Sequence, residues 1–193
     1  MPSSVKALRA ALCAGLFAII LGAGLSAAAA ASERASLATI ERLDVPRYMG
    51  TWHEIAKYPN WFQRRCVADT SARYTQLPDG TVQVLNRCRR EDGSFDQALG
   101  QARQLGAADS PRLQVRFAPA WLGFIPLVWG DYWVIDLDAD YQLVAVSEPR
   151  REYLWILSRT PQVDAARYDA LVQRLIRMGF DANRLERTRQ TPP

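Results

Sequence analysis

Few side chains in this chain have the types and spacing that acid–base, nucleophilic or metal chemistry requires. His53 is the only histidine, and it follows Trp52 in an alternating stretch, so we expect it to point away from the interior. One outward histidine cannot complete a Ser-His-Asp triad or a histidine-based zinc site. The sequence also contains no GxSxG elbow, phosphate-binding loop or HExxH motif. We therefore predict a protein that is not an enzyme and has no catalytic residues, metal or cofactor.

The remaining candidates for chemistry are acids and thiols. Asp138 and Asp140 lie in a short polar stretch between apolar runs, where aspartates form and cap turns. An enzyme acting on a lipid or isoprenoid stays open as an alternative. Such an enzyme would use a free thiol, or Glu54 or Tyr153 as the acid or base.

The N-terminus has the layout of a secretory signal peptide. Lys6 and Arg9 precede an apolar run from 10 to 25, and a tract of small residues follows. The run has about 16 residues, which is shorter than the roughly 20 that a membrane span needs. We expect a signal peptide over 1–31, with a retained anchor as the alternative. The protein would then be exported, to the periplasm or outer membrane of a bacterium and otherwise to the exterior.

Cys13 lies inside this apolar run, but the residues before it do not fit a lipoprotein cleavage site, so we expect no lipid anchor. Removal of 1–31 takes away two basic residues and no acidic residue, and the net charge falls from +4 to about +2. That balance is too weak to indicate nucleic acid as a partner. About 160 residues remain, enough for one domain with a sizeable core.

Alternation of apolar and polar residues dominates the middle of the chain and indicates β-strands. We predict eight strands, at 51–58, 66–76, 81–88, 97–105, 112–118, 131–137, 142–148 and 153–159. After Pro161 the apolar residues recur at helical spacing up to Met178, and Gly179 suits the helix end. This pattern predicts an all-β fold, an eight-stranded antiparallel up-and-down barrel with a C-terminal α-helix packed on its wall.

The predicted strands also set the domain limits and one covalent link. An N-terminal linker covers 32–43, the domain 44–188, and a flexible tail 189–193. Cys66 and Cys88 fall at the start of the second strand and the end of the third, and the intervening turn brings them nearly opposite. In an oxidising compartment this placement predicts a disulfide.

Three short motifs connect this pattern to a known family. "GTWHEIAKYPNWFQ" places Gly50 and Trp52 at the first strand, Asp140-Tyr141 follows the sixth strand, and Arg159 ends the eighth. The chain resembles the lipocalins, and most closely the bacterial lipocalins, which are related to apolipoprotein D and plant temperature-induced lipocalins. The resemblance implies that Trp52 closes one end of the barrel with Arg159 over it. It also implies a binding protein for fatty acids, lysophospholipids or other small apolar molecules.

Strand alternation then selects the inward residues. Taking Trp52 as inward, we predict ligand contacts from residues of the same parity: Trp52, Glu54, Ala56, Val115, Phe117, Tyr132, Val134, Tyr153, Trp155 and Leu157. The list is mostly apolar, as small-molecule pockets are. Side chains that fill a small barrel completely are the alternative.

The loops at the open end of the predicted barrel carry three dibasic pairs. They are Arg64-Arg65, Arg89-Arg90 and Arg150-Arg151. We predict that this basic mouth attracts an anionic lipid ligand or an anionic membrane surface. Simple solubilisation of the loops by arginine is the alternative.

One open-end connection, 118–131, is unusually apolar for a loop. It is predicted to be a lid over the mouth, an exposed patch for a membrane or partner, or plain packing. Trp61 and Phe62 are expected at the same end, and aromatics beside arginines are typical of interfacial anchors. We expect a monomer or a weak homodimer.

Overall fold

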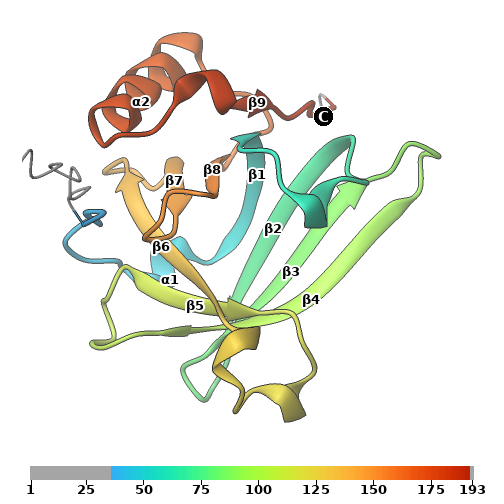
Figure 1. Cartoon of the computed structure of the whole chain (residues 1–193), viewed down its shortest axis with the longest axis vertical. Coiled ribbons are helices and arrows are strands. Elements are labelled where there is room, and N and C mark those ends of the chain that lie inside the picture. Colours follow the sequence, from blue (N-terminus) through green and yellow to red (C-terminus); the bar gives the residue numbers. More distant parts are fainter. Residues whose placement is uncertain (1–35, 192–193) are drawn as a thin grey trace, which may run out of the picture. The chain divides into compact units, whose positions relative to one another are not determined.

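The computed structural model describes residues 36–191 of the chain (Figure 1). The predicted signal peptide 1–31, Cys13 within it and the first part of the linker 32–43 lie outside the described residues. Within 36–191, no helix combines the length and the apolar character needed to cross a membrane.

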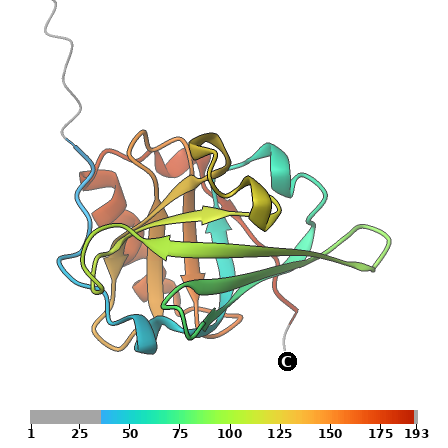
Figure 2. The same cartoon turned by 90° about the horizontal axis from the view of Figure 1, so that it is seen from below.

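Eight antiparallel strands close into a barrel (Figures 1 and 2). They are β1 (Gly50–Lys57), β2 (Ala68–Gln76), β3 (Val82–Arg89), β4 (Phe95–Gln104), β5 (Arg112–Arg116), β6 (Gly130–Leu137), β7 (Leu143–Ser147) and β8 (Leu154–Ser158). Each strand pairs with the next, and β1 pairs with both β2 and β8, which closes the ring. The predicted up-and-down barrel is confirmed.

The helix that follows the strands, α2 (Ala165–Arg177), packs on the outer wall. The side chain of Asp164 accepts a hydrogen bond from the backbone N–H of Arg167 and caps its start. Leu171 and Leu175 are buried against a wall core built from β1, β6, β7 and β8. Every residue of β7 is buried, because one face of this strand meets the barrel interior and the other meets the helix side.

A short helix, α1 (Val45–Tyr48), and the first residues of strand β1 close one end of the barrel. Trp52 is fully buried there, and the guanidinium of Arg159 lies 4.0 Å from the centre of its ring. Gly50 has φ +97°, and a Cβ at this position would lie 3.1 Å from Nη1 of Arg159. The positive φ therefore favours glycine at this position, and a Cβ there would also push the end of the Arg159 side chain slightly away.

The two ends of the domain are more ordered than the predicted linker and tail. In the linker, Leu37 and Leu43 are buried, and Ile40 donates its N–H to the carbonyl of Val134. At the other end, β9 (Glu186–Arg187) pairs with β1, and η4 (Ala182–Arg184) connects it to the region after α2. Both η4 and β9 lie within the predicted domain 44–188, whereas Leu37, Ile40 and Leu43 belong to the predicted linker.

Residues 188–191 fill a seam between β1 and β2. These strands pair only from Gly50 to His53 on the β1 side. Beyond that point the N–H of Thr188 donates to the carbonyl of Ile55, and the N–H of Asp69 donates to the carbonyl of Arg189. The C-terminal segment thus satisfies peptide groups that β1 and β2 leave unpaired, and it departs from the flexible tail expected for 189–193.

Candidate functional site

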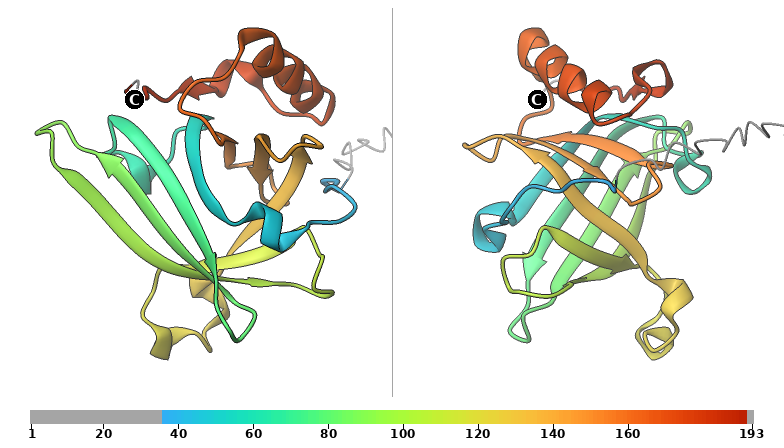
Figure 3. Two further views of the ribbon diagram at one scale, coloured as in Figure 1. Left: turned by 180° about the vertical axis from the view of Figure 1, so that it is seen from behind. Right: turned by 60° about the vertical axis from the view of Figure 1, so that its left-hand side comes forward.

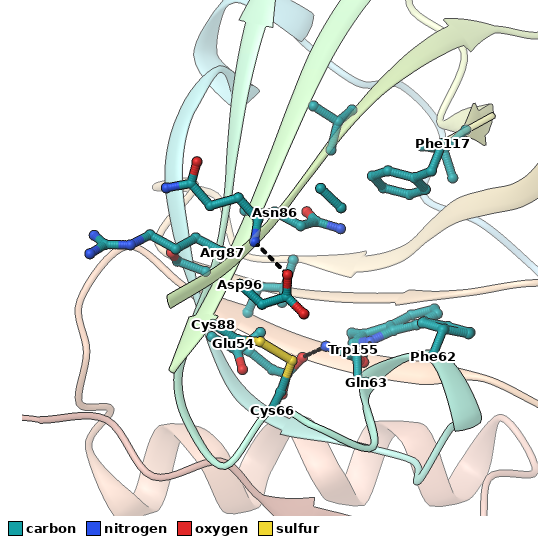
Figure 4. A pocket seen from close by; sticks show the side chains of 18 of the residues that line it. Glu54, Phe62, Gln63, Cys66, Asn86, Arg87, Cys88, Asp96, Phe117 and Trp155 are labelled. Carbon is teal, nitrogen blue, oxygen red and sulfur yellow. Dashed lines mark hydrogen bonds between the residues drawn. A yellow bond between two sulfur atoms is a disulfide. The ribbon is translucent and has the colours of Figure 1, made fainter. Parts of the chain in front are cut away.

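The barrel encloses a cavity of about 500 Å³ that opens at the end opposite Trp52 (Figure 4). Its walls come from β1 to β6, from β8 and from η1 (Trp61–Gln63), the short helix after β1. This volume lies within the range of typical small-molecule sites, about 300–1,000 Å³. The interior is therefore not packed solid.

The structure brings six of the ten predicted ligand-contacting residues together around this cavity. They are Glu54, Val115, Phe117, Tyr132, Trp155 and Leu157. Strand alternation located them because β5, β6 and β8 are regular at these positions and β1 is regular as far as Glu54. Phe117 follows directly after β5.

The other four predicted residues lie elsewhere. Trp52 and Val134 are fully buried in the core that adjoins the cavity floor. Tyr153 does not line the cavity; its ring stacks on that of Trp155, with ring centres 5.9 Å apart. Ala56 is corrected to the helix-side core, because the pairing of β1 with β8 shifts between Glu54 and Ala56 and this bulge reverses the alternation.

Three tyrosine hydroxyls form a chain at the cavity floor, which we call the tyrosine cluster. The Tyr132 hydroxyl lies 2.7 Å from that of Tyr48 and 2.9 Å from that of Tyr74. Burial raises the pKa of Tyr74 to about 12, and it also raises the pKa values of Tyr48 and Tyr132. The floor is thus neutral and polar. The alternation of β2 could have located Tyr74, but Tyr48 precedes the strands.

Glu54 is a buried carboxylate whose oxygens are already occupied. It is 2% exposed and accepts hydrogen bonds from Gln63 Nε2 at 2.7 Å and Thr188 Oγ1 at 2.6 Å. Lys57 Nζ lies 3.2 Å away and balances its charge. Gln63 also accepts from Trp155 Nε1 at 3.1 Å, so this amide holds Glu54 and the indole in fixed positions (Figure 4).

The part of the cavity wall nearest the opening, which we call the upper wall, carries more polar and charged groups than the floor. Cys66 and Cys88 form the predicted disulfide at its edge, with Cα atoms 5.4 Å apart. Asp96 also lines this part, and its Oδ2 lies 3.8 Å from Nη2 of Arg65. Thr70 Oγ1 is buried, and among the described residues it has no hydrogen-bond partner. Sequence reasoning missed Asp96 and Thr70, because polar residues near a strand end do not show an inward direction.

The predicted basic mouth is smaller than expected, since of its six arginines only Arg65 lines the cavity. Arg89 pairs with Asp69 at 2.6 Å, and Arg150 lies 3.1 Å from Glu152. Arg151 donates to the carbonyl of Met178. Arg64 and Arg90 belong to the same loops but are absent from the described cavity wall.

The apolar loop 118–131 packs on the outside of the barrel. Its short helices are η2 (Ala120–Leu122) and η3 (Pro126–Val128), and it projects from β5 and β6 (yellow in Figure 3). The ring of Trp129 lies 4.1 Å from the guanidinium of Arg103 and 5.1 Å from that of Arg116. Among the described residues that line the cavity, none belongs to this loop, so the contacts do not place it as a lid.

The loop leaves large apolar side chains in solvent. Trp121 is 72% exposed, Phe124 80% and Leu127 93%. At the same end Trp61 is 72% exposed and Phe62 50%. Large exposed apolar side chains that gather in one loop are typical of contact with a membrane or a partner.

The described residues offer little for catalysis or metal binding. Both cysteines within 36–191 are joined to each other, and these residues contain no group of three or more His, Cys, Asp or Glu that could hold a metal ion. His53 points out of the barrel toward Gln190, and burial lowers its pKa.

Comparison with known proteins gives consistent matches. A family model described as a lipocalin-like domain matches residues 43–190. Temperature-induced lipocalin-1 of Arabidopsis thaliana is 42% identical over 166 residues, which cover 84% of this chain and 88% of the relative. The outer membrane lipoprotein Blc of Escherichia coli K12 is 36% identical over 146 residues, covering 75% and 78%. Mouse apolipoprotein D is 29% identical over 157 residues, covering 78% of each chain.

Solved structures agree on the fold. Insecticyanin from the tobacco hornworm Manduca sexta superposes with a TM-score of 0.60 at 17% identity, covering 78% of this chain and 82% of that one. Apocrustacyanin C1 gives a TM-score of 0.60 at 12% identity, covering 77% and 81%.

Proposed function

Because this chain belongs to the lipocalin family, we propose that it binds small hydrophobic ligands, most of all fatty acids or lysophospholipids, and stores or transports them in the cell envelope. The observation that carries this proposal is the open cavity of about 500 Å³ in the barrel. An acyl chain along its apolar residues would gain about 0.8 kcal/mol for each CH₂ that leaves water.

The direction of the ligand follows from the distribution of polar groups. The apolar residues Val84, Val115 and Leu157 line the cavity together with the neutral tyrosines, whereas the charged Arg65 and Asp96 lie toward the opening. A tail would therefore enter first, and the polar head group would stay at the mouth, where its hydration costs least to replace.

We propose an exported protein that contacts membranes peripherally. The N-terminal sequence pattern supports export, and one relative is named an outer membrane lipoprotein. The exposed Trp121, Phe124 and Leu127 support insertion of the 118–131 loop at a lipid interface. Ligand uptake from a membrane surface would then need no passage through water.

We favour binding without turnover. Thiol chemistry would need a free cysteine, whereas Cys66 is joined to Cys88. Acid–base chemistry by Glu54 would have to displace Gln63 or Thr188, which donate to its two oxygens. The predicted absence of catalytic residues therefore stays our working hypothesis.

The first test is native mass spectrometry of the mature protein from its own host, followed by solvent extraction and lipid identification. A stoichiometric acyl lipid is the expected result. A matched pair of variants then links binding to the cavity. Ala98 lines the cavity on β4, and its neighbour Leu99 is 61% exposed, so Ala98→Trp should block a fluorescent fatty-acid probe and Leu99→Trp should not. Equal binding by both variants would contradict the proposal.

A further inference from the structure

We propose that the upper wall of the cavity is a subsite for an ammonium group, so that the preferred ligand is a single-chain lipid with a zwitterionic phosphate–ammonium head group. This inference rests on the proposed function, because it assumes that an acyl tail occupies the cavity below. It replaces the anion-selective basic mouth expected from the sequence with a mouth that offers both charges.

An aromatic wall forms one side of the subsite. The ring of Phe62 lies 5.7 Å from that of Tyr153 and 6.3 Å from that of Trp155, and Tyr153 stacks on Trp155 at an interplanar angle of 15°. Phe62 and Trp155 line the cavity. The hydrogen bond from Trp155 Nε1 to Gln63 fixes the indole. Ring faces held in this way attract ammonium groups, and quaternary ammonium ligands are bound by such aromatic surfaces.

A carboxylate faces the aromatic wall across the cavity. Asp96 pairs directly with Cys88 in the β3–β4 register, and paired residues point to the same face, which here is the cavity side. Figure 4 shows its carboxylate directed into the cavity, toward the side that holds Phe62 and Trp155. Glu54 has three side-chain donors of its own, one of them the ammonium of Lys57. Asp96 accepts one hydrogen bond, from the backbone N–H of Gln97 at 3.1 Å, and its Oδ2 has only a loose contact with Arg65 at 3.8 Å. Asp96 is therefore the acid that can accept a ligand cation.

The Arg65–Asp96 pair matches a zwitterion. Both side chains are partly solvated, at 67% and 43% exposure, so a head group can replace their mutual contact. A phosphate would pair with the guanidinium of Arg65, and the ammonium would lie between Asp96 and the aromatic wall. The buried hydroxyl of Thr70, without a partner among the described residues, adds a polar contact in the same wall. A free carboxylate would satisfy Arg65 but leave Asp96 facing a like charge.

The test compares two lysolipids with the same palmitoyl chain, below their micelle concentrations, by isothermal titration. Lysophosphatidylcholine carries an ammonium, and lysophosphatidylglycerol carries hydroxyls in its place. We expect the first to bind about 10-fold tighter, from one ion pair and one cation–π contact, which is about 1.4 kcal/mol. Asp96→Asn should lower the ratio to the small preference that the aromatic wall alone provides, and it should leave the affinity for lysophosphatidylglycerol nearly unchanged. Phe62→Leu should reduce the ratio in part.

The control is Glu91→Gln, which removes an exposed carboxylate from the turn of the same β3–β4 hairpin and should preserve the ratio. Equal affinities for the two lysolipids, in the wild type and in Asp96→Asn, would overturn the ammonium subsite while leaving lipid binding intact. If neither lysolipid nor palmitate binds, the proposed function fails, and the subsite fails with it. If circular dichroism shows that Asp96→Asn is unfolded, the affinity ratio of Phe62→Leu serves as the test, and a ratio equal to that of the wild type would overturn the subsite.

Discussion

The contact between Arg159 and Trp52 makes a measurable prediction for the closed end of the barrel. Arg159→Gln removes a guanidinium that lies 4.0 Å from the indole centre, which is worth about 0.5–2 kcal/mol. It also removes donors to the carbonyls of Arg47 at 2.7 Å and Thr51 at 3.1 Å, at about 1 kcal/mol each. Since Arg159 is partly solvated, we expect a loss of about 2–3 kcal/mol in the free energy of unfolding.

Urea unfolding followed by tryptophan fluorescence measures this loss as a lower midpoint with an unchanged slope. Arg159→Lys should be intermediate, because an ammonium can stay near the ring but cannot reach both carbonyls as a planar fork does. Arg73→Gln is the matched control, since Arg73 is exposed on β2, and we expect a change within about 0.5 kcal/mol. If Arg159→Gln behaves like this control, the guanidinium does not hold the closed end together and our reasoning is wrong.

Three further predictions concern the disulfide, the tyrosine cluster and the apolar loop. Replacing Cys66 and Cys88 by serine releases a loop closed across 22 positions and should lower the free energy of unfolding by about 3 kcal/mol; an unchanged urea midpoint would contradict the entropic argument. Burial raises the pKa of Tyr74 from 10.0 to about 12. The buried neutral hydroxyl therefore contributes fully to the free energy of unfolding below pH 10.0, and this contribution is lost as the pH rises toward about 12. Urea midpoints across this interval should fall together with the appearance of tyrosinate absorbance, whereas a flat profile would mean that the floor is hydrated. Finally, Trp121→Ser with Phe124→Ser should abolish co-flotation with anionic vesicles, and Phe95→Ser, on the outer face of β4, should not; flotation of the double variant would exclude the loop as the anchor.

The sequence predicted the closed end of the molecule better than its open end. Trp52, Gly50 and Arg159 were identified through the resemblance of their motifs to the lipocalins, and the structure shows the glycine conformation and the ring contact that these motifs maintain. The helix after Pro161 was equally clear, since its apolar spacing is helical and its cap residue is explicit. The disulfide followed from the expected oxidising compartment and from the hairpin that brings Cys66 and Cys88 nearly opposite.

The open end was harder to predict because its structure depends on a strand bulge and on contacts between distant residues, which the local sequence pattern does not indicate. A bulge in β1 moved Ala56 to the helix side, although simple alternation placed it inside. The direction of Asp96 becomes clear only from its pairing with Cys88. Arginine pairs in loops looked like one basic surface, but Arg89 and Arg150 are neutralised by acids that the sequence places elsewhere or beside them.

The seam filled by residues 188–191 has a consequence for how the barrel forms. The carbonyl of Ile55, near the start of the domain, accepts from the N–H of Thr188, almost at its end. A chain synthesised or translocated from its N-terminus therefore cannot complete the wall until its last residues arrive. Loop closure over this distance is also slow. Until then the edges of β1 and β2 stay open to pairing with other chains, so the nascent protein should depend on chaperones, and shortened chains should aggregate even though they contain all eight strands.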